Sequence, residues 1–436
     1  MTDAALTFPA AQPEGMQVAF VGKRGALFWL ALKTGFLTIL TLGFYRFWMK
    51  TRMRRWYWSS IRAGGHPMEY VGDPLEKLLG FFIAVVILTF YIGIVNLVLM
   101  FVSFSVFSSA SLGYLASFAG VIPLWFYARY RARRYVLGRT RWRGVRFGLE
   151  KGAWGYAWRA LVHWTITIVS LGLLWPRMTF WLEKYMTDRT YFGSARLHQG
   201  GSWTMLYRAA IPFVLSVLLL GGGALWLFWI DPLVVSADIT LEGVTRSFDE
   251  LIEGGTPAMP VVGVERLLIF PVGILGLIYG AIHYRFASRR ILANHKTSEG
   301  ISMASRLSGP RVASIYVFGS FIAYLVLVLG IVALILGAIG TFGVGAFMGV
   351  DTGPFSWGDG LSQGLRVVLF ASFYLVVFLM WNVVYNTFVT YPLMRHMTKT
   401  LSFPTRYGLR HISQRSRDEF AEAEGFAEAL DLGAAI

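Results

Sequence analysis

The feature that most constrains this chain is a long stretch without a charged side chain. No Asp, Glu, Lys or Arg occurs among the 51 residues from Leu78 to Ala128. Because about 20 apolar residues in a helix cross the roughly 30 Å hydrocarbon core of a bilayer, this run predicts two spans, 78–102 and 113–130. Only 15% of the chain is charged and 56% is hydrophobic, which excludes a soluble globular domain and a disordered chain.

Further apolar runs predict four more spans. Two of them, 209–230 and 266–286, flank an acidic segment at 231–265, and the other two lie in 312–395 around a Gly-rich stretch. The runs are continuously apolar, which excludes alternating barrel strands, and helices satisfy their own backbone groups in lipid. The sequence therefore predicts an all-α, polytopic membrane protein with six spanning helices in three hairpins.

Two shorter apolar segments, 26–48 and 157–181, share a central Leu-Gly pair that ends at Gly43 in the first and at Gly172 in the second. Both flanks of the second segment are basic, so a full crossing there would reverse the sign of every later loop. Gly also tolerates the backbone angles of a tight bend. We expect both segments to be re-entrant from the cytoplasm or to lie in the interface.

Charge is unevenly distributed among the loops and predicts their side of the membrane. The net charge is +16, and the basic excess lies in 50–77, 129–159, 177–208 and 285–311, whereas 231–265 has seven acids and one base. Lys and Arg collect on the cytoplasmic side of membranes. We therefore expect the basic loops and both termini to be cytoplasmic and the acidic loop to be external.

The order of short segment, basic linker, span, loop and span occurs twice, which predicts internal repeats. The two Gly centres are 129 positions apart. The segmentation that follows is a tail at 1–24, a first repeat at 25–150, a second at 151–311, a third helical hairpin at 312–395 and a tail at 396–436.

The N-terminal motifs resemble a known family. The residues concerned are Leu40-Thr41-Leu42-Gly43-Phe44-Tyr45-Arg46-Phe47-Trp48, Arg54-Arg55-Trp56, Met68-Glu69-Tyr70-Val71-Gly72 and Leu78-Leu79-Gly80-Phe81. This pattern resembles the YjgN-like family of bacterial inner-membrane proteins, closely as far as Phe81 and more loosely beyond. The resemblance implies a multi-pass protein of the bacterial inner membrane. The family is classed as a domain of unknown function, so the resemblance supplies no catalytic or binding residues.

A set of polar residues inside apolar segments could line a path for a solute, because ionisable groups within a membrane are costly and often functional. The alternative is that Lys33 and His163 lie at the interface and that the amides hydrogen-bond between helices. The residues of this candidate path are Lys33, Gly43, Asn96, His163, Gly172, Asn382 and Asn386.

Clusters of Arg interleaved with aromatic residues follow the apolar segments, where basic side chains meet anionic lipid headgroups. A pI near 10.0 also suits nucleic acid, but this placement favours the bilayer as partner and no nucleic acid; a protein partner stays open. The candidate headgroup residues are Arg52, Arg54, Arg55, Arg131, Arg133, Arg134, Arg289 and Arg290.

No enzyme motif, metal-ligand spacing or cofactor-binding motif occurs, and the chain has no Cys. We therefore predict no enzymatic activity, no cofactor and no catalytic or metal-binding residue. Two functions stay open: a transporter or channel-like protein for a small solute, with its path near the two bends, and a non-transporting scaffold or anionic-lipid-binding protein. A polar cavity that reaches both bends would favour the first function.

Overall fold

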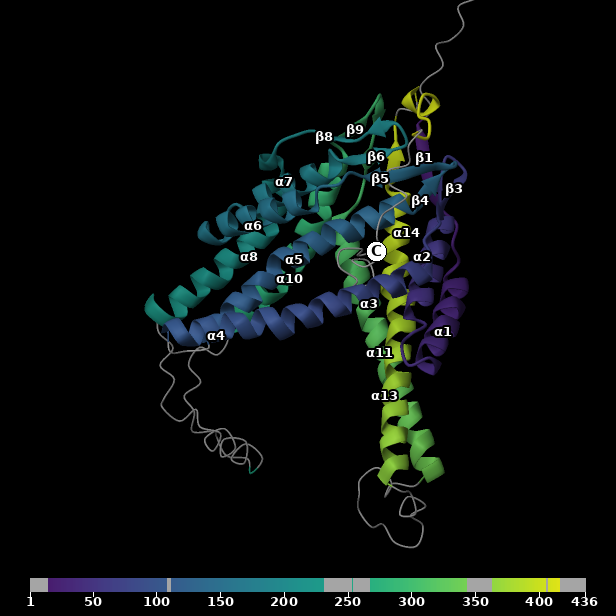
Figure 1. Cartoon of the computed structure of the whole chain (residues 1–436), viewed down its shortest axis with the longest axis vertical. Helices are drawn as coiled ribbons and strands as arrows, with labels where there is room; N and C mark the ends of the chain where they lie inside the picture. The colour runs from purple at the N-terminus through teal and green to yellow at the C-terminus, as the bar shows by residue number, and fades with distance from the viewer. Residues whose placement is uncertain are drawn as a thin grey trace, which may run out of the picture. The chain divides into compact units, whose positions relative to one another are not determined.

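The computed structural model describes residues 15–107, 111–230, 253, 267–342, 363–404 and 407–415 (Figure 1). The chain divides into a larger unit, Met1–Thr204 with Arg290–Ile436, and a smaller unit, Met205–Arg289. Both are mostly helical, as expected.

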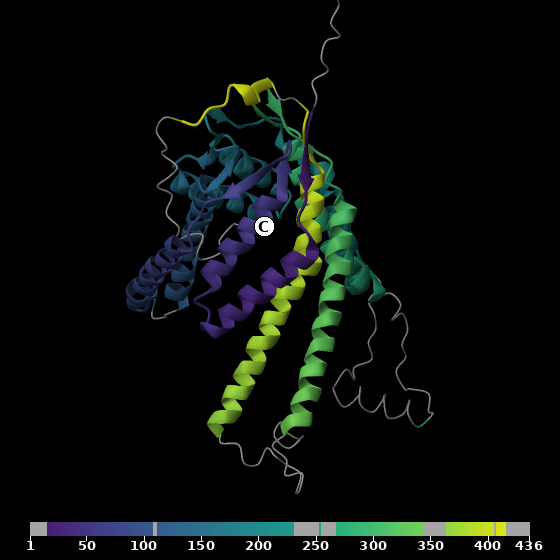
Figure 2. The same ribbon diagram turned by 90° about the vertical axis from the view of Figure 1, so that its right-hand side faces the viewer.

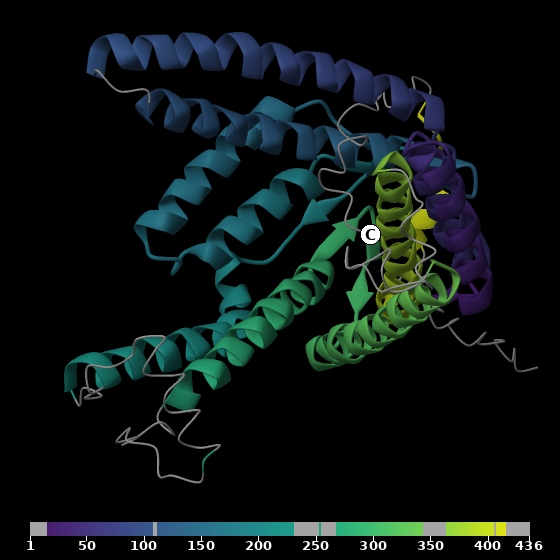
Figure 3. The ribbon, with the colours of Figure 1, turned by 90° about the horizontal axis from the view of Figure 1, so that it is seen from below.

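Helices of the larger unit come in pairs that are consecutive along the chain. In two pairs a π-helical turn interrupts a helix: η1 (Tyr91–Val95) joins α3 to α4, and η5 (Asn386–Thr390) joins α13 to α14. Figure 3 shows α4 running alongside α5, with which it packs. The pairs are α1 (Arg24–Leu40) with α2 (Arg46–Ser60), α3 (Pro74–Phe90) and α4 (Asn96–Phe107) with α5 (Ser111–Gly138), α6 (Ala153–Val169) with α7 (Trp175–Thr187), and α11 (Gly309–Phe342) with α13 (Gln363–Tyr385) and α14 (Tyr391–Lys399).

The smaller unit is one helical pair, α8 (Tyr207–Leu225) with α10 (Ile269–Ala293); the π-helical turn η3 (Trp226–Ile230) extends α8. Small residues let the two helices approach closely. A Cβ at Gly280 would lie 2.6 Å from Phe213 Cα, and one at Gly276 would lie 2.5 Å from Ser216 Oγ. This is the contact that Gly residues spaced by four produce between helices in lipid.

Five helical segments among the described residues are long and apolar enough to cross a membrane. The sixth expected span, 113–130, lies in α5 and is not among them, so the count of six is not confirmed. Helix α5 is apolar only in its first part and carries four Arg from Arg129 onward. The five segments are Pro74–Val106, Trp203–Leu225, Ile269–Ala293, Gly309–Gly337 and Ala371–Lys399.

Short antiparallel strands form a nine-stranded sheet, in the order β11-β12-β1-β2-β3-β4-β5-β6-β7, and a three-stranded sheet, β10-β9-β8. The chain connects the two sheets at both ends: a single residue separates β7 from β8, and a single residue separates β10 from β11. We call β1 to β12 the strand ring (Figures 1 and 2). The strands are β1 (Met16–Phe20), β2 (Ile61–Ala63), β3 (His66–Tyr70), β4 (Thr140–Trp142), β5 (Val145–Leu149), β6 (Thr190–Phe192), β7 (Ala195–Arg196), β8 (His198–Gln199), β9 (Lys296–Ser298), β10 (Ile301–Ser302), β11 (Ala304–Ser305) and β12 (Leu401–Phe403).

The strand ring corrects the all-α prediction. The strands are two to five residues long, which is too short to give a clear periodic pattern, and they lie in basic segments that the charge argument treats as linkers. Positive φ angles at Gly64, Gly144, Gly193 and Gly300 allow the tight turns between strands. With the exception of β1, the strands follow directly after the second helix of a pair, so each pair of helices starts and ends at the ring.

Candidate functional site

The two short apolar segments form helical hairpins with the same bend. The first hairpin is 24–60 and the second is 153–187. At their tips, Leu42 and Leu171 both have φ +50°, while Gly43 and Gly172 have φ +94° and +85°. The Gly43 amide donates to Thr38 and the Gly172 amide donates to Thr167, both at 2.7 Å. Gly is needed here because this region of backbone angles disfavours side chains.

Both tips are apolar and exposed. Leu42 is 85% exposed and Leu171 is 96% exposed. A Cβ at Gly43 or Gly172 would meet no other atom within 4 Å among the described residues. Contiguous exposed apolar surface of this kind marks contact with a membrane or a partner. The exposed neighbours that extend it are Leu40, Phe44, Ile168, Val169 and Leu173.

The first hairpin packs on the last helical pair (Figure 2). Ala31 of α1 is buried against Leu379 and Val383 of α13, and a Cβ at Gly35 would overlap Leu379. Lys33 is exposed on the same helix. The close contact therefore uses the small residues of α1 and leaves the Lys33 side chain outside it.

The amides Asn382 and Asn386 belong to this contact. Asn386 Nδ2 donates to Asn382 Oδ1 at 2.6 Å, and Asn382 Nδ2 donates to Met49 Sδ of the first hairpin at 3.7 Å. Asn96 lies on α4, and its buried Oδ1 has no hydrogen-bond partner in the part of the chain that the structure describes. The Asn382–Asn386 pair thus bonds within the protein, as the packing alternative predicts.

His163 lies in the second hairpin and contacts its other arm. The His163 Nδ1 is 3.2 Å from Arg177 Nη1. Burial, together with the charges of Arg177 and Arg159, lowers the pKa of His163, so its ring is neutral at physiological pH. This hairpin packs on α5 through a buried cluster that includes Tyr130, Tyr156, Met178 and Tyr185. Lys33 and His163 therefore lie on hairpins that pack against different helices.

Most of the candidate headgroup arginines bind protein groups at the helix ends. Arg54 is buried, with its guanidinium 5.2 Å from the Tyr70 ring centroid. Arg134 Nε donates to Leu149 O at 3.2 Å, and Arg290 Nη1 donates to Leu307 O at 3.4 Å. Arg131 Nη1 donates to the Tyr127 hydroxyl at 3.0 Å. The exposed members of the set, whose charge can reach lipid most directly, are Arg52, Arg55 and Arg289.

A carboxylate that sequence reasoning missed joins two helices to the ring. Glu183 Oε1 is 2.7 Å from Lys296 Nζ of β9, and Glu183 Oε2 is 3.3 Å from Arg133 Nη1 of α5. Burial raises the pKa of Glu183, but the charges of Lys296 and Arg133 outweigh burial and hold it well below its usual range. The same position recurs in three helices, seven residues before the following strand begins: it is occupied by Arg54, Arg133 and Glu183. An alignment of these three helix ends would have shown that Glu replaces Arg in the third.

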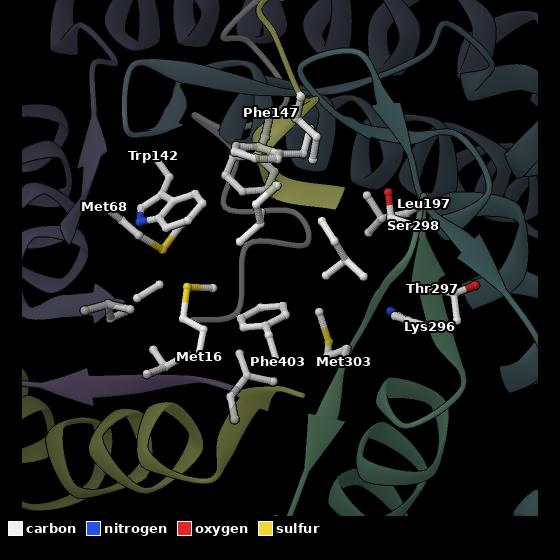
Figure 4. Close-up of a pocket in the computed structure, with 18 residues that line it drawn as sticks. Met16, Met68, Trp142, Phe147, Leu197, Lys296, Thr297, Ser298, Met303 and Phe403 are labelled. Atoms are coloured by element: carbon white, nitrogen blue, oxygen red, sulfur yellow. The ribbon is translucent and has the colours of Figure 1, made fainter. Parts of the chain in front are cut away.

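The strand ring encloses a cavity of about 270 Å³ (Figure 4). Met16 and Val18, which alternate along β1, line it together with Trp142 of β4. Met68 and Phe403 complete much of the apolar wall. No cavity residue was predicted, and the available signal was the alternation of apolar residues at 16, 18 and 20.

Comparison with known families settles the relationship. Residues 15–336 match the family described as "Bacterial protein of unknown function (DUF898)". The chain belongs to the DUF898 family. This agrees with the YjgN-like resemblance, which is thereby confirmed. No curated protein and no solved structure matches the chain.

The DUF898 match covers both hairpins and most of the strand ring. It begins at the first strand and ends within α11, so α13, α14 and β12 lie beyond the matched residues. Among the described residues no group of three His, Asp or Glu side chains could hold a metal ion. The arrangement that the DUF898 chain offers is therefore a pair of apolar hairpins, a set of basic helix ends and an apolar cavity.

Proposed function

We propose that this DUF898 protein is a non-transporting, lipid-binding protein of the bacterial inner membrane. In this proposal the two hairpins insert their tips into the cytoplasmic leaflet, and the exposed Arg52, Arg55 and Arg289 contact anionic headgroups. The observation that carries the proposal is the pair of matching bends with Leu42 and Leu171 almost fully exposed.

The spacing of charges limits how deep the hairpins reach. Arg46 follows Gly43 by three positions, and Arg177 follows Gly172 by five. A basic side chain so near the tip can reach the headgroups only if the tip is within roughly 5–10 Å of them. Tyr45 stacks on Trp48 at 6.1 Å between centroids, and such aromatic residues favour the headgroup level. These features support shallow, interfacial insertion.

The closure of the strand ring supports the proposed topology. Met16 of β1 pairs with Phe403 of β12, so these two strands, near opposite ends of the chain, lie on one side of the membrane. The number of crossings between them is then even. Five candidate spans give an odd number, and α5 supplies the sixth crossing that returns the chain to the ring. With the basic loops inside, we infer a cytoplasmic ring and cytoplasmic termini.

The transporter alternative has less support. Its path requires the bends to line a polar cavity, whereas the cavity described above lies in the strand ring and is apolar. The amides Asn382 and Asn386 are engaged with each other and with Met49. Recurrence of helical pairs followed by strands agrees with internal duplication, which we infer independently of function.

Single-cysteine variants test the proposal, because the chain has no Cys of its own. Leu42→Cys and Leu171→Cys are labelled with a membrane-impermeant maleimide in spheroplasts and in inverted vesicles, and separately with a nitroxide. We expect neither residue to react from either side, and we expect oxygen to relax the nitroxides more strongly than a water-soluble nickel chelate does.

The matched control is Ser59→Cys, exposed at the far end of α2, which should react in inverted vesicles. Reaction of Leu42→Cys or Leu171→Cys from the periplasm would mean that the hairpin spans the membrane. Reaction from the cytoplasm at the rate of Ser59→Cys would place the tips in water. Either result would overturn the proposal.

A further inference from the structure

The cavity inside the strand ring has apolar walls, and the polar side chains of Lys296 and Ser298, which border it on β9, bond elsewhere in the protein. Lys296, Thr297 and Ser298 of β9 lie on one side, opposite apolar side chains of β1, β3 and β4 (Figure 4). The Lys296 ammonium is paired with Glu183 at 2.7 Å. An ionic ligand group inside the cavity would lose its hydration without gaining an equivalent partner. The cavity therefore suits a hydrocarbon.

The size and lining of the cavity favour one flexible chain. Its volume of about 270 Å³ lies just below the ~300–1,000 Å³ typical of small-molecule pockets, and a two-chain phospholipid exceeds it. Met16, Met68 and Met303 supply thioether side chains, which adapt to irregular ligands. Both properties favour a single acyl chain over a rigid ring system.

Residues 407–415, which we call the strap, complete the cavity wall. Leu409 and Ile412 of the strap line the cavity. The strap is fastened from outside by hydrogen bonds to the ring: the Ser194 amide donates to Ser413 O at 2.9 Å, and the Arg146 amide donates to Gln414 Oε1 at 2.9 Å. The strap thus covers part of the cavity.

Guanidinium groups gather where the strap leaves the ring. Arg415 lies 4.1 Å and Arg196 lies 5.8 Å from the centroid of the Tyr191 ring. The Arg146 backbone amide, which bonds Gln414, fixes the residue next to Arg415 at this edge. Glu150, which accepts a hydrogen bond from the Tyr191 hydroxyl at 2.6 Å, is the acid in this contact network. Two guanidinium groups against one carboxylate leave a net positive charge at this edge of the ring, which is attractive to an anion.

We propose that the cavity binds the chain of a single-tailed anionic amphiphile, such as a fatty acid. The hydrocarbon occupies the space between Met16, Trp142 and Met303, and the carboxylate lies at the strap edge beside Arg196 and Arg415. The site is built from the strand ring and lies outside both hairpins. The proposal for this site therefore does not depend on whether the hairpins insert into the membrane.

A photoreactive fatty acid tests the site. The full-length protein in phosphatidylcholine nanodiscs is irradiated with dodecanoic acid that carries a diazirine near its methyl end, and the modified peptides are mapped by mass spectrometry. We expect labelling of β1 and of residues 401–412, and we expect excess unlabelled dodecanoate to displace it. The corresponding diazirine alcohol should label the same peptides several-fold less.

Two substitutions on neighbouring strands provide a matched pair. Ala63 faces the cavity, whereas Ala19 is exposed on the other face of the ring. Ala63→Phe should reduce labelling about tenfold, equivalent to about 1.4 kcal/mol of binding free energy, because the added ring takes space that the hydrocarbon would occupy. Ala19→Phe should leave labelling unchanged. Size-exclusion elution checks that both variants fold.

Labelling confined to the membrane-spanning helices, or labelling of the ring that dodecanoate does not displace, would overturn the proposal. So would unchanged labelling in a folded Ala63→Phe variant. Should Ala63→Phe fail to fold, displacement in the unmodified protein decides the matter. Equal labelling by the acid and the alcohol would refute the anionic headgroup.

Discussion

The Glu183 carboxylate links three parts of the larger unit that are far apart in sequence. It lies on α7 and contacts Arg133 of α5 and Lys296 of β9, and its side chain is 22% exposed. Breaking a buried ion pair leaves the partners uncompensated. Because solvent reaches this pair in part, we expect a smaller effect than for a fully buried one.

Replacing Glu183 with Gln should lower the free energy of unfolding by about 1–3 kcal/mol. The lowered pKa of Glu183 means that its stabilisation is present above the unfolded pKa near 4.5 and is lost as the pH falls through the folded pKa. Thermal unfolding in detergent from pH 7 down to about pH 2 measures both effects, because the pH-dependent loss falls below the unfolded pKa. The control Glu299→Gln, at an exposed turn, should match the original protein, and equal stability of both variants would refute the role.

Each hairpin bend should depend on its Gly for conformation alone. Gly43→Ala and Gly172→Ala should each cost about 1 kcal/mol, because φ stays positive while no neighbouring atom obstructs the added methyl. Gly221→Ala is the matched control: it too has open space, but its φ is helical, so it should be neutral or mildly stabilising. Thermal melts of the three variants measure these changes in stability. Unchanged stability of Gly43→Ala and Gly172→Ala would contradict the requirement for Gly at the bends.

At the scale of elements, the sequence predicts the long helices and both hairpin bends, because each rests on a local signal. Uncharged runs identify spans such as 78–102, and the Leu-Gly pairs identify the turning points. Strands were missed because β6 and β9 are three residues long and each has one partner strand far away in sequence, β5 for β6 and β8 for β9. The cavity depends on those pairings, so the alternation at 16, 18 and 20 could indicate an apolar strand face but not the cavity that this face lines. Glu183 was missed for the same reason, since Lys296 lies 113 positions away.

At the scale of the whole chain, the decisive contact is between the first and last strands. Gln17 of β1 lies directly opposite Ser402 of β12, and paired residues on antiparallel strands have Cβ atoms ~4.5–5.5 Å apart. The double variant Gln17→Cys/Ser402→Cys should therefore form an intramolecular disulfide on mild oxidation, detected as a cross-link that survives proteolysis between the two sites.

The control pair Gln17→Cys/Ser298→Cys, with the second residue elsewhere in the ring, should not cross-link. If Gln17→Cys/Ser402→Cys formed no disulfide in membranes, β1 and β12 would not be paired there. The argument that the number of crossings is even would then be lost.

Pairing of β1 with both β2 and β12 also sets an order for biogenesis. The nascent chain presents β1 and β2 early, but the other edge of β1 waits until several hundred residues have been translated and the final helices have been inserted. A ribosome-bound or prematurely terminated product therefore carries an incomplete ring with a bare strand edge. Quality-control proteases can use that edge to tell unfinished copies from finished ones.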